Sequence, residues 1–114
     1  MVSYASADQG EMDVREDLLE PDEITADQRI VDYTTFIFPA RGVFARRLVC
    51  GPTLKSYSRA FVSLCEVDGN NRPFRGLATM SVANIVPHDD GILEIVGAIQ
   101  WNGDIRIRAS VFWQ

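Results

Sequence analysis

The sequence predicts a small all-β protein, in which six antiparallel strands form a small barrel or a two-layer sandwich behind an acidic N-terminal arm. The 114 residues are 46% hydrophobic and 24% charged, which are ordinary values for one globular domain. From Arg29 onward, turn signals recur at near-regular spacing, and the runs between them are rich in β-branched and aromatic residues. No connector is long enough for a helical crossover, so we expect adjacent strands to pair as an antiparallel meander.

Six runs of strand-forming residues define the expected elements. The connectors at 39–42, 51–53, 68–73, 87–91 and 102–103 contain the Pro, Gly, Asn and Asp residues that are typical of turns. The predicted strands are Ile30–Phe38, Val43–Cys50, Ser56–Val67, Phe74–Val86, Ile92–Trp101 and Ile105–Trp113.

The register of the last two strands can be tested on the sequence. A three-residue loop at 101–103, with Gly103 in the left-handed conformation, pairs Ile99 with Ile105 and Ile95 with Ala109. Because a one-residue slip inverts every side chain, this clean segregation predicts that the odd-numbered residues face inward. The opposite face then collects Glu94, Gln100, Arg106, Arg108 and Ser110.

The strands predicted at 56–67 and 74–86 are apolar on both sides, and such strands need cover on both faces. The arm, a second subunit or a bend between two layers would supply that cover. We expect a homodimer that buries the second face.

Charge divides the chain into an acidic arm, residues 1–28, and a β domain, residues 29–114. The arm carries nine acidic residues and one arginine, whereas the β domain carries ten basic and seven acidic residues. Nine of those ten bases are arginine. We expect the arm to be partly disordered, or to form one short amphipathic helix over residues 11–20. Opposite charge also allows the arm to pack on the arginine-rich domain or on a neighbouring subunit.

The sequence shows no motif of a familiar catalytic or metal site. A nucleophile elbow, phosphate-binding glycine loops and metal-spaced Cys/His clusters are absent, so we expect no catalytic residue, metal or cofactor. His88 beside two aspartates is typical of a polar turn, although it could serve as a general base. Glu94 lies mid-strand, where a cross-strand ion pair with Arg106 or Arg108 is the simpler interpretation and a catalytic role the alternative.

Cellular location is predicted from what the sequence lacks. There is no apolar run long enough to span a membrane and no secretory signal, and Cys50 and Cys65 lie in apolar runs that suit buried thiols. We therefore expect a cytoplasmic protein with no membrane contact.

Arginines on or near the strands are the most distinctive feature. Arginine without lysine favours fixed, bidentate contacts with carboxylates of a partner protein. A net charge of -5 disfavours nucleic-acid binding. The candidate partner-binding residues are Arg46, Arg59, Arg75, Glu94, Arg106 and Arg108.

Aromatic residues give an alternative. They could line the cavity of a small barrel that binds a hydrophobic molecule, although core filling is the commoner use of such residues. The candidate cavity residues are Tyr33, Tyr57, Phe61, Phe74, Trp101 and Trp113.

The sequence therefore predicts a non-catalytic interaction or assembly module, expected to be a homodimer, that binds a protein through an arginine-rich β face and the acidic arm. The alternative is a ligand-binding barrel that acts as a cyclase or isomerase by shaping its substrate. No family is assigned: Arg46 and Arg47 lie within a predicted strand, and the Asp/Asn-x-Ser-x-x-Gly motif of the PilZ family is missing.

Overall fold

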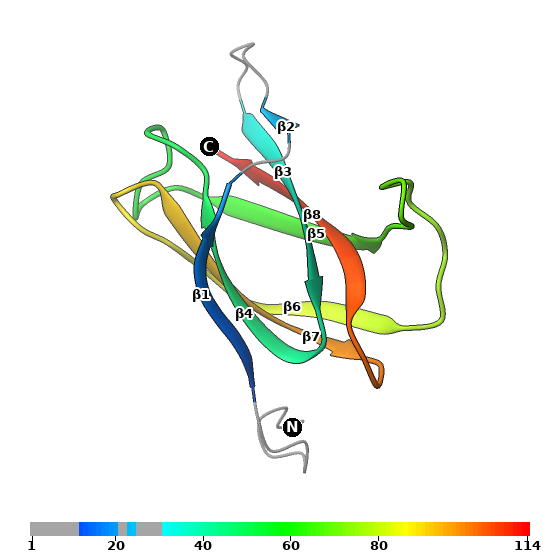
Figure 1. Cartoon of the computed structure of the whole chain (residues 1–114). Helices are drawn as coiled ribbons and strands as arrows, with labels where there is room; N and C mark the ends of the chain where they lie inside the picture. The colour runs from blue at the N-terminus through cyan, green and yellow to red at the C-terminus, as the bar shows by residue number, and fades with distance from the viewer. Residues whose placement is uncertain (1–11, 21–22, 25–30) are drawn as a thin grey trace.

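The computed structural model describes residues 12–20, 23–24 and 31–114, and all of its regular structure is β (Figure 1). The prediction of an all-β protein is therefore confirmed. Seven strands are seven to nine residues long, and β2 has two residues. The strands are β1 (Asp13–Leu19), β2 (Glu23–Ile24), β3 (Asp32–Ala40), β4 (Gly42–Val49), β5 (Ala60–Glu66), β6 (Thr79–Pro87), β7 (Ile92–Gln100) and β8 (Ile105–Trp113).

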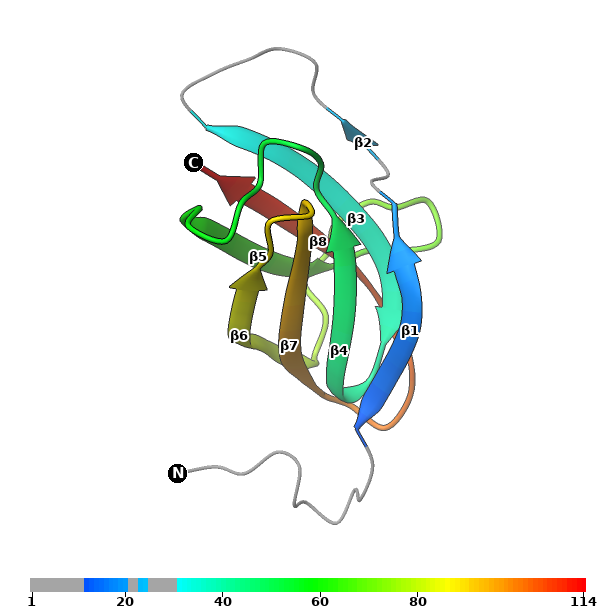
Figure 2. The same cartoon turned by 90° about the vertical axis from the view of Figure 1, so that its left-hand side faces the viewer.

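The strands form two four-stranded sheets packed face to face as an open sandwich (Figures 1 and 2). The first sheet has the order β1-β4-β7-β6, and the second has the order β2-β3-β8-β5. Among the described strands no pairing joins the two sheets, so the barrel alternative is wrong. The part of the chain that the structure describes contains no helix long and apolar enough to cross a membrane.

A long bent ribbon explains why the strands do not follow the expected meander. Residues 32–49 run antiparallel to residues 92–113, and both segments pass from one sheet to the other at the same corner. Gly42 lies at this corner with a φ of +55°, a left-handed conformation that favours glycine. Strands β5 and β6 flank β8 and β7 on the other side, so the β7–β8 segment is central in both sheets.

For the last two strands, the predicted buried face is correct and the predicted pairing is wrong. Odd-numbered residues of β7 and β8 are buried, as the alternation predicts. However, Ile99 pairs with Gly42 and Met80, and Ile105 pairs with Ala40, because β7 and β8 lie in different sheets. Gly103 does not adopt a positive φ. Alternation fixes which side of a strand is buried, but not which strand lies beside it.

The hydrophobic core fills the space between the sheets. Its aromatic residues come mainly from the long bent strand β3–β4 and its aliphatic residues mainly from β7–β8. The buried residues of this cluster are Phe36, Phe38, Ala40, Phe44, Leu48, Leu54, Leu93, Ile95, Ile99, Ile105, Ile107, Ala109, Val111 and Trp113.

The acidic arm contributes a strand and not the expected helix. Residues 13–19 form β1, which pairs in parallel with β4. Extended backbone is favoured here because the edge of β4 offers hydrogen-bonding groups that an added strand satisfies. The rest of the predicted arm, apart from Met12, Glu20 and the two residues of β2, lies outside the described residues.

Gly97 in β7 generates a test of the packing. A Cβ atom there would lie 2.6 Å from the carbonyl oxygen of Ser81 and 2.7 Å from the ring of Phe44. We expect Gly97→Ala to lower the free energy of unfolding by about 2 kcal/mol, as overpacking does, in urea titrations. Gly103→Ala is the matched control, because a Cβ atom there meets nothing within 4 Å. Equal stability of the two variants would contradict the packing described.

Candidate functional site

Arg46, which the sequence groups with the surface arginines, lies inside the protein. Only 2% of the residue is exposed, because it shares the inward side of β4 with Phe44 and Leu48. Its guanidinium lies 5.4 Å from the ring centre of Phe38 and 5.6 Å from that of Phe44. These distances suit cation–π contacts, and this burial removes Arg46 from any contact surface.

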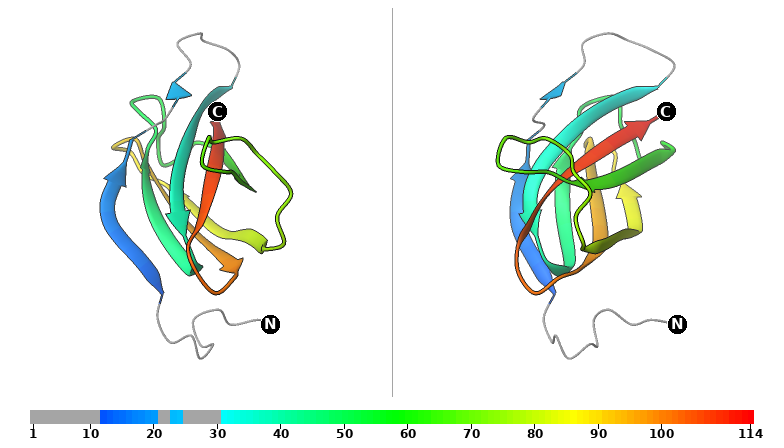
Figure 3. Two further views of the ribbon diagram at one scale, coloured as in Figure 1. Left: turned by 45° about the vertical axis from the view of Figure 1, so that its right-hand side comes forward. Right: turned by 90° about the vertical axis from the view of Figure 1, so that its right-hand side faces the viewer.

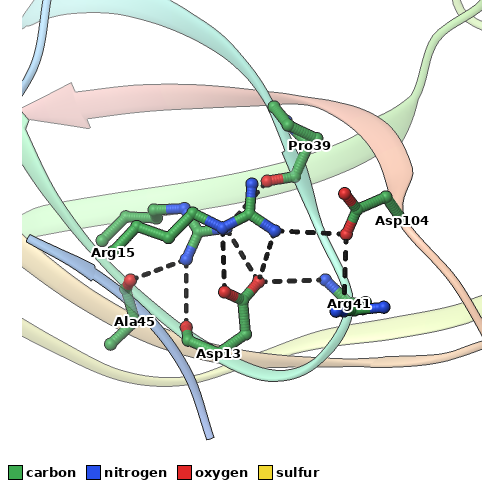
Figure 4. A network of polar contacts seen from close by, with 7 residues as sticks. Asp13, Arg15, Pro39, Arg41, Ala45 and Asp104 are labelled. Atoms are coloured by element: carbon green, nitrogen blue, oxygen red, sulfur yellow. Dashed lines mark hydrogen bonds and ion pairs between the residues drawn. The ribbon is translucent and has the colours of Figure 1, made fainter. Parts of the chain in front are cut away.

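The Arg46 guanidinium donates to oxygen atoms of Asp13, Pro39 and Ala45, which are labelled in Figure 4. The Nη2 atom donates to Oδ2 of Asp13 at 2.9 Å and to the Pro39 carbonyl at 2.8 Å. The Nη1 atom donates to the carbonyls of Ala45 at 2.9 Å and Asp13 at 3.1 Å. A buried charge is tolerated when it is paired and hydrogen-bonded in this way.

Asp13 connects this buried arginine to the surface. It accepts from Nε of Arg15 at 2.9 Å, and Arg15 reaches Asp104 at 3.2 Å. Burial alone would raise the pKa of Asp13, but hydrogen bonds from Arg46 and Arg15 outweigh it and bring the pKa below its ordinary value. Burial lowers the pKa of Arg46, which the bond to Asp13 partly offsets. This arginine network (Asp13, Arg15, Arg46, Asp104) fixes β1 to the sandwich.

The remaining candidate arginines lie at the surface, and Arg108 is half-buried there. Arg106 and Arg108 point outward from β8, and Arg59 directly precedes β5. Arg75 is exposed in the β5–β6 connection. The Nε atom of Arg106 donates to the side-chain oxygen of Asn71 at 2.8 Å.

Glu94 does not lie with Arg106 and Arg108, because β7 and β8 belong to different sheets. The expected ion pair between these residues is therefore wrong. Glu94 pairs across the first sheet with Arg47, and its Oε1 atom lies 2.6 Å from Nε2 of His88. Both side chains of this His88–Glu94 contact are largely exposed.

Three aromatic side chains form a row across the outward side of the second sheet. Tyr33 and Phe61 are the register partners of Phe112 on its two sides. All three are exposed, Phe61 by 67%, and the rings of Tyr33 and Phe112 lie 5.9 Å apart. Sequence reasoning left Phe112 out of its candidates. The signal was present, because an even-numbered residue of β8 must point outward.

The expected aromatic cavity does not form. Trp113 belongs to the core, with its Nε1 donating to Thr53 Oγ1 at 3.0 Å, whereas the other five aromatic candidates are exposed. A shallow apolar hollow of about 300 Å³ lies beside the row instead. Its lining residues are Val31, Arg59, Phe61, Phe112, Trp113 and Gln114.

Charge on the outward side of β3, β5 and β8 has one sign. The outward positions of these three strands hold Arg106 and Arg108 but no carboxylate. A row of three hydroxyl residues, Thr35, Ser110 and Ser63, lies between the aromatic row and the arginines. We call this surface the aromatic–arginine face and define it by Tyr33, Phe61, Phe112, Arg106 and Arg108. Figure 3 shows the second sheet from this side.

Other reactive groups offer little chemistry. Burial raises the pKa of the Cys50 thiol to about 12, so the thiol is protonated at neutral pH and unreactive. Among the described residues, no group of three or more His, Cys, Asp or Glu side chains is placed to hold a metal ion.

Comparisons with known proteins gave no match: no family model, no curated protein and no solved structure is significantly similar to this chain.

The arginine network predicts the effect of removing its anion. We expect Asp13→Asn to lower the free energy of unfolding by about 3 kcal/mol, because it leaves the Arg46 charge buried without a counter-ion. Urea titration measures this change. Asp104→Asn, which removes an exposed partner of Arg15, should cost at most about 1 kcal/mol. An equal effect of the two substitutions would contradict the role given to Asp13.

The lowered pKa of Asp13 also predicts a pH dependence. A carboxylate whose pKa is lowered in the folded state contributes its full stabilisation at a pH above its unfolded-state pKa of about 3.9. This stabilisation is lost as the pH falls through the folded-state pKa. The stability difference between the wild type and Asp13→Asn should therefore be constant from pH 7 to about pH 5 and should shrink below about pH 4. Denaturant titrations over this range measure it, and a difference that does not begin to shrink below about pH 4 would refute the assignment.

Proposed function

We propose that this protein is a non-catalytic binding module that docks an acidic segment of a partner protein on its aromatic–arginine face. The observation that carries the proposal is the aromatic row Tyr33–Phe112–Phe61, which lies on the same side of the sheet as Arg106 and Arg108. The partner chemistry is an extended chain that combines apolar side chains with carboxylates.

The exposed aromatic row supports binding energetically. When a partner covers exposed apolar surface, each Å² removed from water contributes about 25 cal/mol of favourable binding free energy. Aromatic residues and arginine are also the residue types enriched where protein interfaces concentrate their binding energy. The hollow beside Phe61 and Phe112 would receive an apolar side chain of the partner.

The charge of the face supports an acidic partner. Arg106 and Arg108, with no carboxylate at the outward positions of β3, β5 and β8, can each offer a planar pair of donors to a carboxylate. A nucleic acid would gain little from the rest of the molecule, because the protein carries a net charge of -5. We place the module in the cytoplasm, since Cys50 and Cys65 are both free thiols.

Peptide titration tests this proposal. We would follow a fluorescein-labelled 12-residue peptide of alternating Glu and Leu by anisotropy, with a Lys–Leu peptide of equal length as its counterpart. We expect the wild type to bind the Glu–Leu peptide at least about tenfold more tightly. The double variant Arg106→Glu, Arg108→Glu should reverse this preference. Phe61→Ser combined with Phe112→Ser should weaken binding of both peptides.

Controls separate the face from general charge effects. Lys55→Glu reverses a charge in the β4–β5 connection, where Lys55 contacts the Asp89 carbonyl, and should leave the preference unchanged. Equal affinity of the wild type for the two peptides would overturn the proposal. Tight, steeply salt-dependent binding of a 12-nucleotide oligo(dT) by the wild type would replace it with single-strand recognition.

A further inference from the structure

We infer that the outward side of the first sheet is a self-complementary surface that pairs with the same surface of a second copy of this chain. The inference is independent of the proposed function, because it concerns the opposite side of the sandwich. Figure 2 shows this surface toward the viewer, with β6, β7, β4 and β1 side by side. We call it the apolar face.

Small apolar side chains make up most of the apolar face. Val14 on β1, Ala45 on β4 and Val96 on β7 lie in one row across three neighbouring strands. Val14, Leu18 and Val86 are all more than one-third exposed. A shallow hollow of about 330 Å³ lies over these strands. A surface this apolar at the middle of a sheet is typical of a protein interface.

At the centre of the face lie one cation and one anion, and the exposed Glu16 at its β1 edge lines the same hollow. Arg47 and Glu94 are register partners on the two central strands, β4 and β7, and Leu18 and Val86 continue their row on either side. Arg47 has no ion-pair partner among the described residues. Glu94 uses its Oε1 atom for His88, so Oε2 can accept from another donor.

These two charges determine which surface can cover the apolar face. Burying a charge at an interface costs desolvation free energy, which is offset only when a group of opposite sign lies against it. The covering surface must therefore offer an anion opposite Arg47 and a cation opposite Glu94, at the spacing of two neighbouring strands. A second copy of the face meets this requirement with the same two residues.

Two-fold symmetry gives the geometry. With the axis parallel to the strands and midway between β4 and β7, β4 of one copy faces β7 of the other. Arg47 then lies opposite Glu94 of the second copy, and Ala45 lies opposite its Val96. Leu18 likewise lies opposite Val86 of the second copy. Complementarity therefore holds for these central pairs, whereas Val14 at one edge lies opposite Asn84 of the second copy.

The area implies a reversible dimer. Four strands at about 4.8 Å spacing and seven residues at about 3.4 Å each give a patch of roughly 450 Å². This is below the roughly 800 Å² per partner of a standard stable interface, so dissociation should be measurable at micromolar concentrations.

Sedimentation with charge-reversed variants tests the inference. We expect the wild type to change from monomer to dimer between about 1 and 200 µM. Arg47→Glu and Glu94→Arg should each weaken dimerisation at least about tenfold, because each places like charges opposite one another. An equimolar mixture of the two variants should recover dimers, since the new glutamate of one chain then faces the new arginine of the other. Recovery in the mixture requires contact between chains.

The controls keep the test independent of folding and of the other face. Thermal unfolding establishes that each variant is folded, and Ala45→Arg provides a second way to block the face if Glu94→Arg unfolds on losing its contact with His88. Arg106→Glu reverses a charge on the opposite side and should leave dimerisation unchanged. A wild type that stays monomeric throughout, a mixture that does not recover dimers, or a dimer lost through Arg106→Glu would each overturn the inference.

Discussion

The pairing of Arg46 with Asp13 is the constraint on which the arrangement of this sandwich depends. A guanidinium inside a small hydrophobic core requires an anion, and the body of the protein supplies only carbonyl oxygens around it. The carboxylate comes from β1, which is distant in sequence from β4. The acidic segment is therefore part of the fold. Its strand β1 adds the fourth strand to the first sheet and supplies the carboxylate that neutralises Arg46.

The network also separates the two outward surfaces. Because Arg46 is used internally, the outward-facing arginines of the central strands divide between the sheets: Arg47 lies on the first, and Arg106 and Arg108 lie on the second. The first face combines apolar side chains with Arg47, Glu94 and, at its edge, Glu16, whereas the outward positions of β3, β5 and β8 combine aromatic rings with arginines. Two surfaces of such different chemistry suit two different occupants.

Sequence patterns predicted the strands well and their neighbours poorly. Alternation along residues 92–113 identified the buried side chains, because burial on one face is a local property. It could not reveal that β7 and β8 enter different sheets, since this depends on the bend at Gly42 and on pairing with distant segments. The same error placed Glu94 with Arg106. The prediction that Arg46 lies on the surface was wrong as well, because its burial depends on distant residues, Asp13, Phe38 and Phe44, that come together only in the fold.

The long bent ribbon of residues 32–49 and 92–113 affects how the chain folds. Residues 92–113 supply the central strand of both sheets, and Asp32 pairs with Trp113, so almost every strand depends on the same late segment. During synthesis, β3 to β6 leave the ribosome before β7 and β8, with which each of them pairs. Pairings over such long sequence separations form slowly, and open edges in the meantime attract other chains. Assembly of this small protein is therefore nearly all-or-none, and a chaperone that shields β3 and β4 would raise its yield.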